Sequence, residues 1–149
     1  MKRPILRSSL LVCLLIAAAF AAWSWFRPYA WHQDPAARCQ VLETLVTRDQ
    51  SFFWVHVHLK VNPGLTHDLQ KPVLLVTASG HELEPADTTF GSNGGQGTTD
   101  IWLKFWLESA DLTRALTLHV NDGKLIVKSS EGVPPLANSA SRNFTTNQW

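Results

Sequence analysis

Apolar and polar residues alternate one by one through much of the chain beyond residue 40. From Phe53 to Val61 the odd-numbered positions are apolar, whereas His56, His58 and Lys60 fall between them. The segments 101–108 and 116–120 repeat this alternation. Because successive side chains of a β-strand point to opposite faces of a sheet, a period of two predicts strands that bury one face.

Further strands are predicted over residues 41–47, 73–78, 81–84 and 124–128. The sequence Asn121-Asp122-Gly123 lies between two of these segments, and its Asp-Gly pair tolerates the positive φ angles of a tight hairpin turn. Residues 40–48 are the most ambiguous, because their apolar positions also fit the spacing of a helix. About seven short strands separated by turn signals predict an all-β fold, an antiparallel β-sandwich over residues 40–130.

A different pattern occupies the first 26 residues. The stretch from Ser8 to Phe26 carries no charge over 19 residues, and a helix of that length reaches about 28 Å, close to the ~30 Å hydrocarbon core of a bilayer. Three basic residues precede the stretch, and several aromatic residues, Trp31 among them, crowd its far end. These features predict one transmembrane helix with a cytoplasmic N-terminus and an extracytoplasmic body.

Two other interpretations of this segment stay open. Ala19-Phe20-Ala21 fits the cleavage site of a signal peptide, although the apolar stretch exceeds the usual ~7–15 residues of a signal core. Cys13 follows apolar residues as in a lipoprotein, but Val12 stands where such a signal needs a small residue. An uncleaved anchor therefore remains the favoured interpretation.

The pattern divides the chain into four parts. Residues 1–26 form the cytoplasmic N-terminus and the anchor, 27–39 a linker, 40–130 the sandwich, and 131–149 a tail rich in Pro, Ser and Asn. The strand count and the anchor together resemble the immunoglobulin-like domains that bacterial envelope proteins hold outside a membrane on one N-terminal helix. The antibody-type pair of core cysteines is absent, since Cys39 is the only cysteine beyond the anchor.

Charge and cysteine content exclude several classes of function. The chain has 149 residues and a net charge of +1, and its first 26 residues carry +3, which leaves 13 − 3 = 10 bases against 12 acids in the remainder. A mildly acidic body lacks the basic face that sequence-independent nucleic-acid binding requires. Two cysteines are too few for a disulfide framework or a four-cysteine zinc site.

Catalytic motifs are weak. The glycine-rich residues 91–97 lack the Gly-Lys-Ser/Thr ending of a nucleotide loop, and no Gly-x-Ser-x-Gly sequence is present. Glu82, Glu84 and Asp87 cluster near His81 and offer acid and base groups, but solvated charges are the commoner explanation of such a cluster. We expect a protein that is not an enzyme and that needs no cofactor.

The main candidate binding surface consists of Trp102, Lys104 and Trp106. Both tryptophans, like Trp54, fall on the face opposite the apolar row of their strand. If that face is open to solvent, the indoles form a platform for a partner. If the tail or a loop covers the face, they are ordinary core residues, and packing is the commoner fate of large aromatic side chains.

The alternative candidate site is a metal site built from His56, His58 and His119. Three imidazoles converging from adjacent strands suit a zinc ion with an open fourth position. This hypothesis requires His56 and His119 to lie on neighbouring strands and on the same face of one sheet.

The sequence therefore predicts a single-pass protein of the cell membrane with an extracytoplasmic domain, periplasmic in a Gram-negative cell. We expect a binding module, a non-enzymatic subunit or accessory protein of an envelope assembly, whose partner is a protein, a peptide or a glycan and not a nucleic acid. The alternative is a metal-binding or metal-dependent envelope protein.

Overall fold

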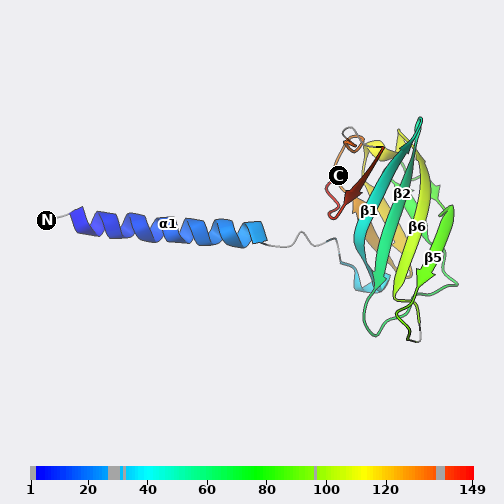
Figure 1. The fold of residues 1–149 in the computed structure, drawn as a ribbon, viewed down its shortest axis with the longest axis horizontal. Helices are drawn as coiled ribbons and strands as arrows, with labels where there is room; N and C mark the ends of the chain where they lie inside the picture. Colours follow the sequence, from blue (N-terminus) through cyan, green and yellow to red (C-terminus); the bar gives the residue numbers. More distant parts are fainter. Residues whose placement is uncertain (1–2, 27–30, 32, 96, 137–139) are drawn as a thin grey trace.

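The structure is a computed structural model that describes residues 3–26, 31, 33–95, 97–136 and 140–149. Its body consists of two antiparallel sheets packed face to face, which confirms the all-β sandwich (Figure 1). The first sheet has the strand order β5-β6-β2-β1-β9 and the second the order β4-β3-β7-β8. The strands are β1 (Cys39–Asp49), β2 (Phe52–Val61), β3 (Leu74–Thr77), β4 (Glu82–Leu83), β5 (Asp87–Gly91), β6 (Asp100–Glu108), β7 (Leu116–Val120), β8 (Gly123–Lys128) and β9 (Ser141–Phe144).

The strand order follows a known pairing scheme. Immunoglobulin-type sandwiches pair strands A, B, E and D in one sheet and C, F and G in the other. With β1 as strand A, the order β1-β2-β6-β5 corresponds to A-B-E-D, and β3-β7-β8 corresponds to C-F-G. The additional strand β4 extends the second sheet beside β3, and β9 extends the first sheet beside β1.

The core lies between the sheets and is built from the inward positions of the alternating segments. Strand β2 contributes Val55, Val57 and Leu59, and the paired strand β6 contributes Leu103, Phe105 and Leu107, all of them buried. Leu75, Leu118 and Leu125 cover the same core from the second sheet. Burying each such side chain stabilises the fold by about 1.5–3 kcal/mol.

Strand β1 contains a β-bulge that explains its ambiguous sequence. The register with β2 shifts between Val41 and Glu43, so Leu42 is an extra residue without a partner. Before the bulge the odd residues Cys39 and Val41 are buried, and after it the even residue Thr44 is buried instead. A bulge shifts the buried positions from odd to even residue numbers. The resulting spacing of apolar residues resembles that of a helix.

Two strands were not expected from the sequence. Strand β5 pairs with β6 across the glycine-rich residues 91–99, and β9 pairs with the edge of β1. The segment expected to be a tail thus contributes an edge strand and, further on, the buried Trp149. Edge strands need only one neighbour, so their sequences show little alternation.

The hairpin between β7 and β8 is confirmed, but its turn is shifted by one residue from the expected position. Val120 pairs with Gly123, so Asn121 and Asp122 form the turn, and Asn121 has the positive φ of 53°. Gly123 is needed for another reason: a Cβ there would overlap the backbone nitrogen of Ala37. The 3-10 helix η1 (Pro35–Ala37) packs directly against this glycine.

The segment expected to be a linker is partly attached to the sandwich. Residues 27–30 and 32 lie outside the described residues, whereas Trp31 and Ala37 belong to the core cluster. Asp34 Oδ2 accepts the backbone N–H of Lys124 at 2.8 Å, which joins this segment to β8. Trp31 was expected near lipid headgroups, but its side chain is only 8% exposed, against the core.

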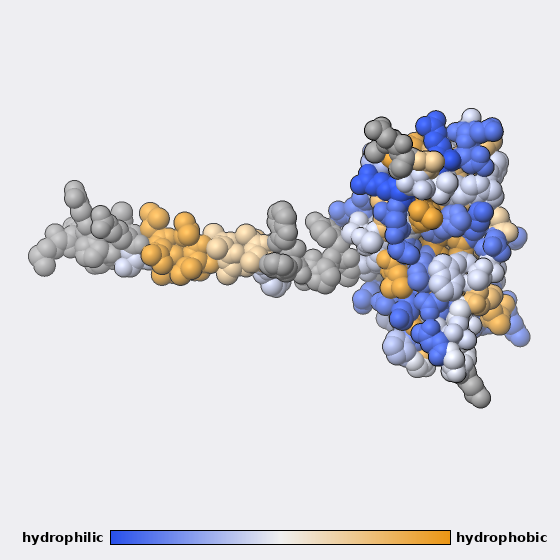
Figure 2. All heavy atoms as spheres, viewed as in Figure 1, coloured by the Kyte–Doolittle hydropathy of each residue, from blue (hydrophilic) through white to orange (hydrophobic). Residues whose placement is uncertain are grey.

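The N-terminal segment forms the helix α1 (Arg3–Phe26), which stands apart from the sheets in Figure 1. Figure 2 shows a hydrophobic band along this helix. Leu10, Leu14 and Ile16 of the helix are exposed. Within the part of the chain that the structure describes, no helix is both long and apolar enough to cross a membrane. The transmembrane helix expected from the sequence is therefore unsupported by the structure.

Candidate functional site

The outer side of the first sheet carries a row of aromatic side chains on its two central strands. We call it the aromatic face and define it as Phe52 and Trp54 of β2 with Trp102, Lys104 and Trp106 of β6. Trp102 is 40% exposed and Trp106 is 42% exposed. The alternation along β6 places them there, because Ile101, Leu103 and Phe105 point into the core. We expected these indoles to be packed against other residues, and this expectation is wrong for Trp102 and Trp106.

Two ring stacks cross from β2 to β6. The ring centroids of Phe52 and Trp106 lie 4.3 Å apart with planes inclined by 26°, and those of His58 and Trp102 lie 4.6 Å apart at 17°. Neighbouring strands are themselves about 4.8 Å apart. His58 and Trp102 are directly opposite in the register, whereas Phe52 and Trp106 are diagonal neighbours. Each stack therefore joins the two strands and covers one flat side of its indole.

A cation lies between the two stacks. Lys104 Nζ is 4.2 Å from the centre of the Trp54 ring, a distance at which a cation and an indole attract each other. The indole N–H of Trp54 donates to Asp49 Oδ2 at 3.2 Å. Across the register Lys104 pairs with His56 on one side and Asp87 on the other. Partial burial and the charge of Lys104 lower the pKa of His56, which favours its neutral form.

His58 lies between two carboxylates at one end of the aromatic face. Its Nε2 is 3.0 Å from Asp100 Oδ1, and its Nδ1 is 3.6 Å from Glu43 Oε1. Hydrogen bonds from Thr99 and His58 lower the pKa of Asp100. Both ring nitrogens of His58 thus face carboxylates, which fixes the imidazole against Trp102 and leaves it poorly placed to bind a metal or a substrate.

A glycine on the neighbouring strand makes room for Trp102. A Cβ on Gly91 of β5 would lie 2.7 Å from Trp102 Cζ3 and 3.0 Å from Cη2, so the indole covers the place where a side chain would stand. An aromatic ring over a cross-strand glycine is a known way to stabilise an edge. Trp102 is therefore held by His58 on one side and by Gly91 on the other.

The three histidines proposed as zinc ligands do not come together. His56 and His58 lie on the outer side of the first sheet, but His119 lies on β7 of the second sheet, where it pairs with Leu74 and Lys124. The outer sides of the two sheets face opposite directions, so the condition for this metal site is not met. Among the described residues no group of three His, Cys, Asp or Glu side chains is placed to hold a metal ion.

The acidic residues near His81 are also separated. Glu82 lies on β4 of the second sheet and Asp87 on β5 of the first. His81 instead has Nδ1 3.5 Å from Asp111 Oδ1, and its side chain is largely exposed. His81 thus pairs with Asp111 of η2 (Asp111–Thr113), which the sequence did not place beside it.

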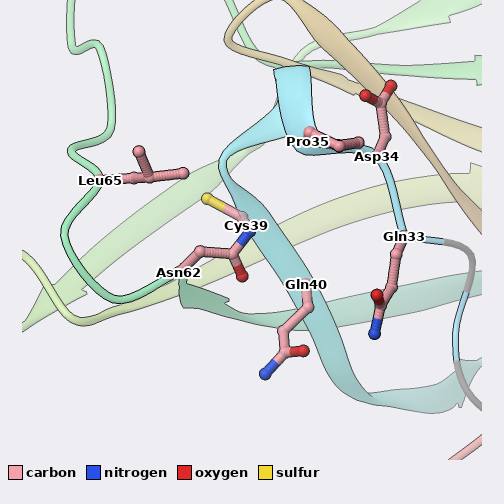
Figure 3. Close-up of a pocket in the computed structure, with 7 residues that line it drawn as sticks. All are labelled: Gln33, Asp34, Pro35, Cys39, Gln40, Asn62 and Leu65. Atoms are coloured by element: carbon pink, nitrogen blue, oxygen red, sulfur yellow. The ribbon is translucent and has the colours of Figure 1, made fainter.

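A pocket of about 270 Å³ lies where the attached linker meets the loop after β2 (Figure 3). Its wall includes Asp34, Cys39, Asn62 and Leu65. The Cys39 side chain is 1% exposed, and burial raises the pKa of its thiol to about 11. A cross-link between chains through Cys39, one use considered for a lone cysteine in an oxidising compartment, is excluded by this burial. Among the described residues that line the pocket, Asp34 alone is charged, and its carboxylate accepts the backbone N–H groups of Ala36 and Lys124.

Three residues in or beside the aromatic face were not identified from the sequence. Phe52 has the same parity as Trp54, so extending the alternation by one residue would have included it. Glu43 and Asp100 reach His58 only because β1 and β6 flank β2, and the order of strands in a sheet is not written in the alternation. Comparison with known proteins gives no relative: no family model, no curated protein and no solved structure matches the chain.

Proposed function

We propose that this protein is a non-enzymatic binding module of immunoglobulin-like architecture, anchored in the cell membrane by α1 and exposed on the extracytoplasmic side. The aromatic face binds a protein partner of an envelope assembly. One observation carries this proposal: two indoles at the centre of a regular sheet are 40% and 42% exposed. Exposed aromatic residues of this kind are enriched at protein–protein interfaces.

The proposed anchor rests on the sequence and on apolar exposure, although no helix among the described residues is both long and apolar enough to cross a membrane. The 19 uncharged residues from Ser8 to Phe26 follow three basic residues, and large apolar side chains along α1 such as Leu10 and Phe20 are exposed. Exposed apolar surface of this extent needs an apolar environment. A bilayer supplies one, and the basic residues ahead of the span orient the N-terminus toward the cytoplasm.

The orientation of the rings favours a protein over a glycan. A sugar ring stacks on the flat side of an indole, but the Trp102 and Trp106 rings each give one flat side to His58 or Phe52. Rings with one flat side covered offer less stacking area to a sugar but still expose apolar atoms to a protein surface. The exposed indole edges and Lys104 add hydrogen-bond donors at the centre of the contact.

The proposal is tested by cross-linking in intact cells. A photoreactive amino acid replaces Lys104 on the aromatic face and, in a matched control, Thr117 on the outer side of the second sheet. A tag on the cytoplasmic N-terminus avoids disturbing the buried Trp149. We expect one cross-linked partner at position 104 and none at 117, with loss of the product in Trp102→Ala and Trp106→Ala.

The variant Val133→Ala controls for exposed apolar surface in general, since Val133 is 43% exposed outside the aromatic face. This change should leave the cross-link intact. Equal cross-linking at positions 104 and 117, or a product that survives both tryptophan substitutions, contradicts the proposed binding face.

A further inference from the structure

One end of the sandwich gathers the attached linker, the loop after β2 and the turn between β7 and β8. We call it the linker end and define it by residues 34–38, 62–71 and 121–122. The Asn62 N–H donates to the Arg38 carbonyl at 2.9 Å, and the Asp122 N–H donates to the Ala36 carbonyl at 3.2 Å. Arg38 Nη1 donates to the Thr66 carbonyl at 3.3 Å. These bonds place the three segments side by side.

Polar side chains fix the loop in place. Asn121 Oδ1 accepts the Asp68 N–H at 2.8 Å and lies 3.1 Å from His67 Nδ1. Asp122 forms ion pairs with Arg38, at 2.8 Å, and with Lys71. The loop is therefore a braced part of the sandwich, and its side chains have a defined place on the surface.

Large apolar side chains nevertheless project into solvent at this end. Leu69 is 71% exposed, and Leu65 and Phe90 are each 45% exposed. The Phe90 ring lies 5.9 Å from the ring of His67, which places it beside the same loop. The fold thus holds three large apolar side chains outside the core on a braced surface.

The distance to the anchor is limited by the chain. Trp31 is packed against the core, and α1 ends at Phe26. Five residues span at most roughly 18 Å, whereas the 11 residues of β1 extend about 33 Å from one end of the sandwich to the other. Trp31 precedes Asp34 of the linker end by only three residues, and Asp34 is bonded to β8. The linker end is therefore within reach of the membrane surface whenever α1 spans the bilayer.

We propose that the linker end rests on the bilayer, with Leu65, Leu69 and Phe90 inserted at the level of the lipid headgroups. This inference rests on the proposed anchoring by α1. The linker end carries two basic side chains, Arg38 and Lys71, against three acidic ones, Asp34, Asp68 and Asp122. Both basic side chains are paired with Asp122. The contact is therefore apolar and gains nothing from anionic lipid. The anchor keeps the linker end near the bilayer, which raises the effective concentration of membrane there. Even a weak contact is therefore formed for much of the time.

The test uses the full-length chain in phosphatidylcholine vesicles. Cys13→Ser removes the exposed thiol and leaves only the buried Cys39. Single cysteines then replace either Leu69 or Val133, which is also exposed but lies near η2 (Asp111–Thr113) at the far end, since Gly132 N–H donates to the Thr113 carbonyl. Each receives an environment-sensitive fluorophore, and lipids with nitroxide headgroups serve as quenchers.

We expect the label at position 69 to be quenched roughly threefold more than the label at 133, since inserted groups reach about 5–10 Å into the headgroup boundary. Adding phosphatidylglycerol should not raise the ratio. Equal quenching at both positions, in a chain that floats with the vesicles, overturns the contact and leaves the anchor intact. A chain that does not float with the vesicles overturns the anchor and this inference with it.

Discussion

Trp102 is held in an exposed position by its neighbours, not by burial. Its indole stacks on His58 and covers Gly91, and His58 is in turn fixed by two carboxylates. An ordered, exposed aromatic side chain loses little conformational entropy when a partner binds, because its rotamer is already chosen. The surroundings of Trp102 thus favour the binding that we propose for the aromatic face.

Cys39 shows the opposite arrangement, a reactive group withdrawn from solvent. Burial raises the pKa of its thiol to about 11 from the ordinary value of 9.0. At pH 8 this lowers the thiolate fraction about a hundredfold, and only the thiolate attacks thiol reagents. In a Cys13→Ser chain we expect no reaction with a disulfide reagent in the native state and full reaction in guanidinium chloride.

The same pKa shift makes stability depend on pH. The unfolded chain releases the Cys39 proton near pH 9, but the folded chain retains it until about pH 11. Stability from this group is therefore complete below pH 9 and is lost as the pH rises toward 11. Denaturant unfolding at pH 8 and pH 10.5 measures the loss, and Cys39→Ala should reduce it. A native thiol that reacts as fast as the unfolded one contradicts this account.

At the scale of elements, alternation predicted the long strands but not where they lie in the sheets. Strands β2 and β6 were expected almost at their observed bounds, because each buries one face along its whole length. Strand β1 was ambiguous because the bulge at Leu42 changes its parity. Strands β5 and β9 were missed because short edge strands bury too little to show a period.

The candidate site divides in the same way. The position of Trp102 and Trp106 opposite the apolar row follows from parity along one strand, and the sequence predicted it. Their exposure was not predicted, because packing was the expected fate of these indoles. The grouping of His56, His58 and His119 needed the order of strands, and that hypothesis is wrong because β2 and β7 belong to different sheets. Contacts between residues distant in the chain, such as His58 with Glu43 and Asp100, required the fold.

Gly123 shows how one residue couples two elements. A Cβ there would overlap the Ala37 backbone nitrogen and lie 2.7 Å from Asp34 Oδ2. Backbone atoms cannot swing aside, so Gly123→Ala must push η1 away from β8. We expect a loss of about 1–3 kcal/mol in the free energy of unfolding, as for other overpacked sites, measured by denaturant titration.

Gly95→Ala is the matched control, because no atom lies within 4 Å of the added Cβ and the residue has no positive φ. Its effect should stay within about 0.5 kcal/mol. If the two variants were equally stable, η1 would move away from β8 without any loss of stability. The close packing of the attached linker would then not contribute to the stability of the fold.

At the scale of the whole molecule, Trp149 joins the two sheets where their edges meet. Its ring stacks on Phe144 of β9 at 5.0 Å with planes inclined by 18°, and Lys128 Nζ of β8 lies 5.8 Å from the ring centre. The Ser130 hydroxyl donates to the Trp149 carbonyl. Because β8 and β9 belong to different sheets, this residue closes one side of the sandwich.

Trp149→Ala should therefore cost about 3–5 kcal/mol, the usual loss for a large aromatic residue removed from a core. Its side chain is only 4% exposed. Trp149→Phe keeps the stack on Phe144 and removes an indole N–H that has no hydrogen-bond partner among the described residues. Its loss of stability should therefore be smaller, roughly 1–2 kcal/mol.

Leu69→Ala, at a side chain 71% exposed, is the control and should be nearly neutral. Thermal and denaturant unfolding rank the three variants. If Trp149→Ala were as stable as Leu69→Ala, the residues after β9 would not contribute to the stability of the sandwich. If Trp149→Ala is the least stable variant, these residues stabilise the fold by joining its two sheets.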